Sequence, residues 1–181
     1  GNASASRIAD IMAKTKSGYS ASRENYLTQL VLERFGIFEE SFNSEAMQHG
    51  TDTEPFARAT YELNNNVFVE EVGYILHPTI AKSGASPDGK INDGLLEIKC
   101  PLSKTHFEYV LGDRVPIKYK PQMAWQMACT GALWCDFVSF DNRVPEGLQY
   151  FEIRYHRDNE YIAELEKEVT QVGHWATTVQ A

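Results

Sequence analysis

Cysteine is scarce in this chain, and its few copies are poorly placed for cross-links or metal binding. The 181-residue sequence contains three cysteines, Cys100, Cys129 and Cys135, and no two of them have the CxxC spacing of a zinc site. An odd count argues against a disulfide framework, and three thiolates are one fewer than an iron–sulfur cluster usually requires. We therefore expect a protein of a reducing compartment, the cytoplasm.

Long hydrophobic runs and an excess of positive charge are also absent. No apolar stretch approaches the roughly 18 residues of a membrane span, and no signal-peptide pattern opens the chain, so we expect no membrane partner. The net charge of -8 argues mildly against nucleic acid as a partner. Carboxylates gathered at a metal site would add to this total, so net charge does not decide the question.

The remaining composition is that of an ordinary globular protein, with 43% hydrophobic and 23% charged residues. No internal repeat, low-complexity tract or linker divides the sequence, and we predict a single domain over residues 1–181. The chain starts almost inside a motif, with Gly1-Asn2-Ala3, and we interpret its N-terminus as truncated.

The first half of the chain reads as helices followed by a strand. Apolar residues at helical spacing predict helices over about 4–14 and 22–35. A third helix is expected to start at a Ser44 cap and to bend just after Glu54, because Pro55 removes a backbone hydrogen bond. β-Branched and aromatic residues after the turn at 64–66 predict a strand that extends to about residue 78.

The second half alternates strands and helices. A hairpin is expected over 81–100 with its turn at 92–94, followed by helices over 105–112 and 119–134, strands over 135–141 and 148–157, and a closing helix that Asp158 caps. Helices therefore surround a sheet that includes hairpins, which indicates a mixed α/β fold.

The hairpin carries the side chains with the clearest chemistry. Glu97 and Lys99 are two positions apart and point to the same face of a strand, roughly 7 Å from each other. Pairing of the two arms can bring Asp88 opposite Glu97, which gives two oxygen ligands for a hard cation such as magnesium. A neighbouring lysine can orient or deprotonate the attacking water, or offset charge on a phosphoryl group.

A plainer interpretation is that Glu97 and Lys99 form an exposed ion pair, worth at most about 1 kcal/mol. On spacing alone the two interpretations are equally good. A calcium loop starting at Asp88 is excluded, because Lys90 and Lys99 would occupy its third and twelfth positions, which require oxygen ligands.

A family resemblance favours the catalytic interpretation. Pro87-Asp88, eight further residues and then Glu97-Ile98-Lys99 match the PD-(D/E)xK nuclease signature. The wider string SPDG…LEIKCP resembles the phage lambda exonuclease and YqaJ-type viral recombinase family. Its Gly-x-x-x-Glu helix motif fits residues 50–54, and its Tyr-x-x-Gln motif fits residues 119–122. The motifs keep the family's order and spacing across roughly residues 4–140, and the last 40 residues add little.

The resemblance implies a restriction-endonuclease-like core, with a mixed central β-sheet flanked by helices, and a two-ion magnesium site that also accepts manganese. By the same match, Asp88, Glu97 and the carbonyl of Ile98 would bind the first ion, and Glu54 would reach the second. Lys99 would act on the attacking water, and Gln122 would hold the water or the scissile phosphate. Gln126, one turn further along the helix, would extend that surface.

The resemblance also assigns residues to the binding of the DNA end. By position in the family pattern, the residues expected to contact DNA or its 5′ phosphate are Ser6, Thr105, His106 and Tyr119. Family members carry an arginine upstream of the segment matched by Ser6, and this chain starts too late to show one. Thr105 stands where the best-known member has a second arginine, and Lys104 and His106 lie beside it.

The family's activity would make this protein a magnesium-dependent 5′→3′ exonuclease that acts on double-stranded DNA ends. It would release mononucleotides and leave 3′ single strands for phage-type homologous recombination in a bacterial host cell. A homotrimeric ring around DNA and a phage single-strand annealing protein are the implied partners. Two alternatives stay open: a structure-specific or restriction-type endonuclease, which would cut closed circular DNA, and a non-catalytic DNA-binding module, which would bind without turnover.

Overall fold

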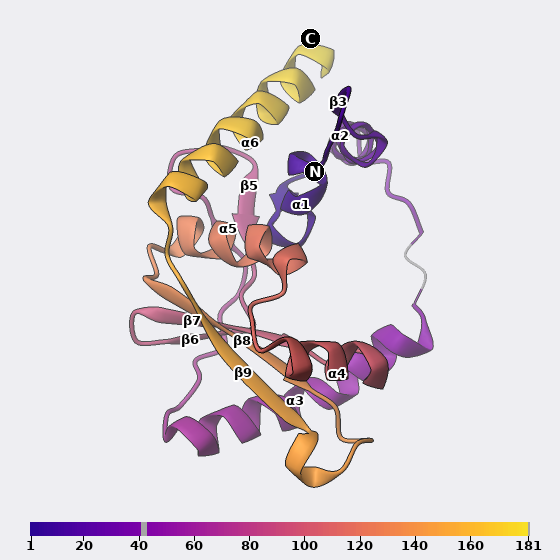
Figure 1. The fold of residues 1–181 in the computed structure, drawn as a ribbon. Helices are drawn as coiled ribbons and strands as arrows, with labels where there is room; N and C mark the ends of the chain where they lie inside the picture. Colours follow the sequence, from indigo (N-terminus) through magenta and orange to yellow (C-terminus); the bar gives the residue numbers. More distant parts are fainter. Residues whose placement is uncertain (41–42, 181) are drawn as a thin grey trace.

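A computed structural model describes residues 1–40 and 43–180, and its centre is a four-stranded mixed sheet (Figure 1). The strand order is β6-β7-β8-β9. Strands β7 and β8 run parallel, whereas β6 and β9 pair antiparallel with their neighbours. The bounds of these strands are Gly89–Ile91 for β6, Gly94–Lys99 for β7, Trp134–Phe140 for β8 and Tyr150–His156 for β9. The mixed sheet predicted from the sequence is confirmed.

The parallel pair β7 and β8 requires a crossover, because parallel neighbours cannot be joined by a tight turn. The crossover consists of α4 (Ser103–Gly112), the 3-10 turn η2 (Ile117–Tyr119) and α5 (Lys120–Thr130). Pro121 lies in the first turn of α5, where its missing N–H has no intrahelical partner to lose. Gly131 ends α5 with a φ of 76°, a left-handed conformation that glycine adopts without strain.

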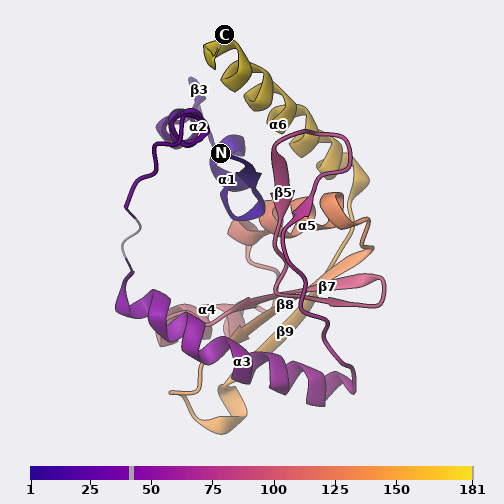
Figure 2. The same cartoon turned by 180° about the vertical axis from the view of Figure 1, so that it is seen from behind.

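Helices cover both faces of this sheet. On one face, α3 (Glu45–Asn65) packs Ala57 and Tyr61 against Leu96, Ile98 and Val138. The opposite face packs against α5 and α4, and this is the larger core, which also includes α1 (Ile8–Met12), α2 (Ala21–Arg34) and α6 (Asn159–Gln180). Figures 1 and 2 show α2 and α6 at one end of the molecule and α3 at the other. Both faces of β7 are therefore buried, and Glu97 lies inside the protein.

The N-terminal segment forms a second, smaller sheet instead of one long helix. The order of this sheet is β1-β5-β4, with bounds Ala3–Ser4, Ser83–Ala85 and Ile75–Leu76. The turn η1 (Ala5–Arg7), the strands β2 (Lys14–Thr15) and β3 (Gly18–Tyr19), and the turn η3 (Glu146–Leu148) complete the elements of the described chain. The predicted helix over 4–14 is wrong in its length, because residues 3–4 pair in parallel with β5 before α1 begins.

The strand predicted after the turn at 64–66 and extending to about residue 78 is also wrong. Helix α3 continues through Pro55 without a break and reaches Asn65, and Asn66 then adopts a left-handed φ of 51° as its C-cap. Within 67–78 the ladder is limited to the isolated bridge between Glu70 and Lys90 and to the two residues of β4. A strand needs a partner along its length, and the neighbouring strand β6 has only three residues.

Two helix caps and the hairpin turn agree with the sequence. Ser44 accepts a hydrogen bond from the Met47 amide at 3.2 Å, and Asp158 accepts one from the Tyr161 amide at 3.1 Å. The hairpin comprises β6 and β7 alone, since residues 83–85 belong to the other sheet. Gly94 after the turn lies against Trp134, where an added Cβ would come within 2.1 Å of the indole.

All three cysteines carry free thiols, as the sequence indicates. In the part of the chain that the structure describes, no helix is both long and apolar enough to cross a membrane.

Candidate active site at the β6–β7 hairpin

Asp88 and Glu97 lie across the hairpin from each other. The register that pairs Gly89 with Leu96 places Asp88 opposite Glu97, and the Asp88 amide donates to the Leu96 carbonyl at 3.1 Å. The Asp88 carboxylate accepts a hydrogen bond from the Ile98 amide at 2.7 Å. This bond fixes the carboxylate just before the first residue of β6, where the chain enters the hairpin. The predicted pairing of the two acids is confirmed.

Glu97 is held by three donors inside the protein. Its side chain is 2% exposed, and the Lys99 ammonium lies 2.5 Å from its Oε1. Gln122 donates to the same oxygen at 2.8 Å, and Gln126 donates to Oε2 at 2.7 Å. The two glutamines are four residues apart on α5, so they present their amides on one helix face. The alternative of a solvent-exposed ion pair is therefore wrong, because Glu97 is buried and its orientation is fixed.

Asp88 and Glu97 carry more negative charge than Lys99 alone can neutralise. Burial, together with the charges of Glu97 and Glu54, raises the pKa of Asp88 to about 8 against the opposing effects of the Ile98 amide and Lys99. Burial alone lowers the pKa of Lys99, but the contact with Glu97 and the charge of Asp88 outweigh it and leave that pKa raised. Lys99 is thus protonated, and the pocket still favours one more positive charge.

Glu54 lies beside this pair, but its carboxylate is directed to an arginine. Arg58, one turn later on α3, donates from Nη2 to Glu54 Oε1 at 2.8 Å and from Nη1 to the Asp88 carbonyl at 2.6 Å. A weaker ion pair joins Arg58 to Glu71 at 3.7 Å. Arg58 therefore links α3 to the start of the hairpin. Sequence reasoning missed it, although the spacing of Glu54 and Arg58 is that of an i,i+4 ion pair.

The donor chemistry fits one magnesium ion. Asp88 and Glu97 supply hard carboxylate oxygens, and magnesium characteristically takes one or two carboxylates and keeps several waters. Among the residues that the structure describes, no three or more Asp, Glu, His or Cys side chains are arranged as a ready-made metal cluster. Since Glu54 is paired with Arg58, the second ion and the Ile98 carbonyl ligand remain predictions.

Of the other predicted site residues, one lies beside the hydrogen-bonded group around Glu97 and the rest lie outside it. Tyr119 is a neighbour: its ring stacks on Phe137 at 5.5 Å, and the Lys99 ammonium lies 4.8 Å from its centroid. Ser6 is exposed on η1, and Thr105 is half-buried on α4, both outside the hydrogen-bonded group. Their contact with DNA stays a prediction.

His106 is placed differently from the expectation. It is fully buried, its Nδ1 is 2.7 Å from the Ser139 hydroxyl, and its Nε2 is 2.7 Å from the Leu148 carbonyl. Both ring nitrogens are therefore engaged in joining α4 to β8 and to the turn before β9. This arrangement leaves no nitrogen of His106 for a DNA phosphate, so we do not include it among the proposed DNA contacts.

If this site hydrolyses its substrate with magnesium, Arg58→Gln is expected to lower its catalytic efficiency by about 10–100-fold, the usual cost of losing a group that orients a metal ligand. The loss should be larger at low than at high magnesium concentration, because Arg58 would no longer hold the backbone of Asp88 at the start of the hairpin. Hydrolysis measured against magnesium concentration tests this. Arg58→Lys, which keeps the charge but not the two-pronged geometry, should recover only part of the activity. An unchanged magnesium dependence in Arg58→Gln would contradict the positioning role.

Comparisons with known proteins connect this geometry to a family. Residues 1–133 match the model of the YqaJ-like viral recombinase domain. The structure is similar to the alkaline exonuclease LHK-Exo from Laribacter hongkongensis, with 47% identity, a TM-score of 0.91, and coverage of 98% of this chain and 88% of that chain. The structure of LHK-Exo in complex with dAMP gives a TM-score of 0.92 at the same identity and coverage. No curated protein sequence matches the chain significantly.

A more distant likeness supports the fold alone. A phage related exonuclease from Haemophilus somnus 129PT aligns over 99% of this chain and 95% of its own, with 13% identity and a TM-score of 0.75. The mixed sheet with helices on both faces is thus the predicted restriction-endonuclease-like core.

Proposed function

Because this chain belongs to the YqaJ-like viral recombinase domain family, we propose that it is a magnesium-dependent exonuclease that degrades double-stranded DNA from its 5′ ends. The observation that carries the proposal is the pairing of half-buried Asp88 with buried Glu97 across the hairpin, with Lys99 in contact with Glu97. A relative of 47% identity, LHK-Exo, is an alkaline exonuclease. The products would be mononucleotides and a 3′ single strand available for recombination.

Asp88 and Glu97 are the residues that would hold the magnesium ion, which supplies Lewis acidity toward water and phosphate oxygens when bound. Hydrogen bonds within the protein already hold both carboxylates in place. The Ile98 amide fixes Asp88, and the two α5 glutamines fix Glu97. Groups held in this way do not have to reorganise when the substrate arrives, which is the main source of electrostatic catalysis.

Lys99 supplies positive charge without being a metal ligand. Its ammonium contacts Glu97 and lies over the Tyr119 ring, so two neighbours limit its position. It is protonated in this arrangement and can donate hydrogen bonds to the attacking water or to an oxygen of the scissile phosphate. Gln122, whose amide donates to Glu97, retains its amide oxygen as an acceptor that can orient the same water.

The wider assembly is part of the same proposal. We propose a homotrimeric ring around the DNA and a phage single-strand annealing protein as partner, acting in the cytoplasm of a bacterial host. A ring would allow a locally positive channel in a protein with a net charge of -8. Sedimentation of the purified chain, with and without duplex DNA, measures the assembly independently of catalysis.

The reaction is tested with linear duplex DNA that carries a label at either the 5′ or the 3′ end. We expect labelled mononucleotide to appear early from the 5′-labelled duplex in the presence of magnesium, and none in EDTA. Covalently closed circles of the same sequence should remain intact, because they have no end. Cleavage of closed circles would identify an endonuclease instead. Binding of both substrates without any hydrolysis would leave a non-catalytic DNA-binding module.

A further inference from the structure

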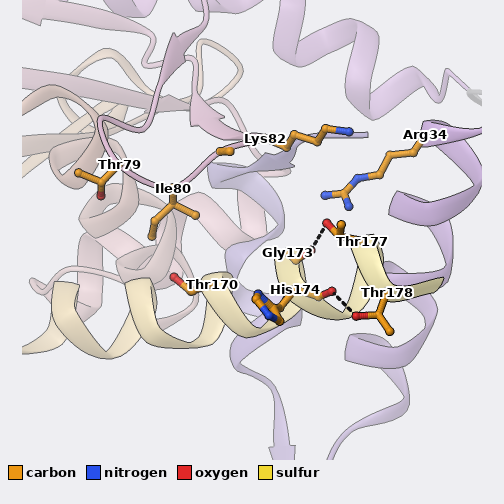
Figure 3. Close-up of a pocket in the computed structure, with 10 residues that line it drawn as sticks. Arg34, Thr79, Ile80, Lys82, Thr170, Gly173, His174, Thr177 and Thr178 are labelled. Carbon is orange, nitrogen blue, oxygen red and sulfur yellow. Dashed lines mark hydrogen bonds between the residues drawn. The ribbon is translucent and has the colours of Figure 1, made fainter. Parts of the chain in front are cut away.

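A second site of distinct chemistry lies at the other end of the molecule from α3. A cavity of about 550 Å³ opens between the C-terminal half of α6, the segment before β5 and the end of α2 (Figure 3). Its walls include Arg34 from α2, Thr79 and Lys82 from the segment before β5, and Thr170, His174 and Thr177 from α6. None of the residues assigned above to the hairpin site lines this cavity.

The charge of the cavity is opposite to that of the protein. The chain has 25 acidic and 17 basic residues. Among the residues that the structure describes, the lining of the cavity includes Arg34, Lys82 and His174 and no carboxylate. Two permanent positive charges without a paired acid repel each other, and an anion bound between them would remove that cost. The lining therefore favours a negatively charged ligand.

One nitrogen of Arg34 also lacks a hydrogen-bond acceptor within the described part of the chain. Its Nε donates to the Gly1 carbonyl at 3.2 Å, whereas its Nη1 is buried and has no hydrogen-bond partner among the described residues. A buried donor that is left unpaired destabilises the fold, and a charged donor does so more than a neutral one. Figure 3 shows the guanidinium and the Lys82 side chain extending to the same side of the cavity, with Thr177 below the guanidinium.

The α6 hydroxyls do not compete for this role. Thr177 donates to the Gly173 carbonyl at 2.9 Å, and Thr178 donates to the His174 carbonyl at 3.0 Å. Their hydrogens are used within the helix, so recognition of an anion falls to Arg34 and Lys82. A guanidinium offers parallel N–H donors that match two oxygens of a phosphate, and a lysine adds a compact positive charge.

We propose that this cavity binds the phosphate group of a nucleotide or of a nucleic-acid strand, at a site separate from the hairpin. Two cations suit a phosphate better than a singly charged carboxylate. The volume leaves room for the sugar that a nucleotide or strand carries beside its phosphate. The site does not require hydrolysis, so it can be tested in a protein without metal.

Calorimetry of the full chain in EDTA, titrated with inorganic phosphate, acetate, dAMP or a short single-stranded oligonucleotide, provides the test. Arg34→Gln with Lys82→Gln should weaken binding of phosphate and dAMP on the order of 10–100-fold, the equivalent of losing charge-assisted hydrogen bonds. The matched control is Arg114→Gln with Lys167→Gln, which removes the same charge from exposed positions outside the cavity. The control should bind as the wild type does.

The probes separate the two sources of phosphate. The affinity that Arg34→Gln with Lys82→Gln removes is the part due to the cavity. A larger loss for the oligonucleotide than for dAMP, with steeper salt dependence, would identify a strand as the ligand, whereas an equal loss would identify a nucleotide. Acetate that binds as tightly as phosphate would overturn the assignment. So would a cavity variant that binds phosphate as the wild type does.

Thr177→Glu supplies a second test that does not depend on the removal of an arginine. A carboxylate near Arg34 should act as a built-in anion, raise the melting temperature in phosphate-free buffer, and abolish the stabilisation that phosphate gives the wild type. A variant whose melting temperature is unchanged and still responds to phosphate would overturn the proposal. The hairpin is untouched in all these variants. Normal hydrolysis with lost phosphate binding, or the reverse, therefore distinguishes this site from the proposed exonuclease.

Discussion

Lys99→Ala is expected to lower the rate of DNA hydrolysis by about 10²–10⁴-fold, the range that a positioned proton-transfer or charge-stabilising group contributes. The structure gives the reason. The Lys99 ammonium lies 2.5 Å from the buried Glu97 carboxylate, and the Tyr119 ring also limits its position. A water molecule that replaces the ammonium restores neither its charge nor its fixed position.

The same variant should bind magnesium at least as tightly as the wild type does. Lys99 offers no ligand atom to a cation, and its positive charge repels one. Calorimetric titration with magnesium, beside release of label from linear duplex, separates the two effects. The matched control is Lys167→Ala, since Lys167 is an exposed lysine on α6 and its loss should leave both values near the wild type. Loss of magnesium binding in Lys99→Ala would show that the lysine supports the fold of the pocket instead of the reaction.

Asp88→Asn is expected to have opposite effects on activity and stability. Hydrolysis should fall by about 10²–10⁴-fold, because one of the two carboxylates that would hold the ion is lost. The metal-free protein should become more stable at neutral and alkaline pH. The asparagine side chain can still accept the hydrogen bond from the Ile98 amide, but it removes the repulsion that Glu97 and Glu54 exert on Asp88.

The pH dependence follows from the direction of the pKa shift. Folding raises the pKa of Asp88 from its ordinary value of 3.8 to about 8, so the folded state holds a proton that the unfolded state has lost. Protonation of Asp88 makes its full contribution to the free energy of unfolding below about pH 4. This contribution declines as the pH rises and is lost above about pH 8. At about 1.4 kcal/mol per pH unit of difference, the loss is large against a typical total stability of about 5–15 kcal/mol.

Thermal melting of the wild type and Asp88→Asn between pH 4 and pH 9 in EDTA measures this difference. The gap in melting temperature should widen as the pH rises, and magnesium should narrow it by stabilising the wild type alone. Asp52→Asn is the control, because Asp52 is an exposed carboxylate two residues from Glu54 on the same helix. A constant gap over this pH range would show that Asp88 does not carry the excess charge of the pocket.

The elements with local signals could be predicted from the amino-acid sequence. Apolar spacing and caps at Ser44 and Asp158 located the long helices, and the turn at Asn92-Asp93 located the hairpin. Because hairpin pairing is short-range and strands alternate their faces, the opposition of Asp88 and Glu97 also followed from the sequence. The order of the motifs along the chain indicated in addition that Glu54 and Gln122 lie near the same site.

Features that depend on partners far along the chain required the tertiary structure. The strand expected after residue 66 is limited to Ile75–Leu76, because β6 is too short to pair with the rest of it. Residues 3–4 form a strand because β5 lies beside them. His106 is interior because Ser139 and Leu148, 33 and 42 residues away, supply its hydrogen-bond partners.

Packing also sets the electrostatics of the site. An alternating strand indicates that Glu97 and Lys99 share a face, but only the position of α5 over that face shows that the face is dry. In water the Glu97–Lys99 ion pair would add little to stability. Burial fixes its geometry and leaves the nearby charge of Asp88 without a cation of its own. The contact of Arg58 with the Asp88 carbonyl depends on the packing of α3 against the hairpin. The basic cavity depends on the packing of α2 and α6 against the segment before β5. Such long-range contacts leave no periodic signal in the sequence.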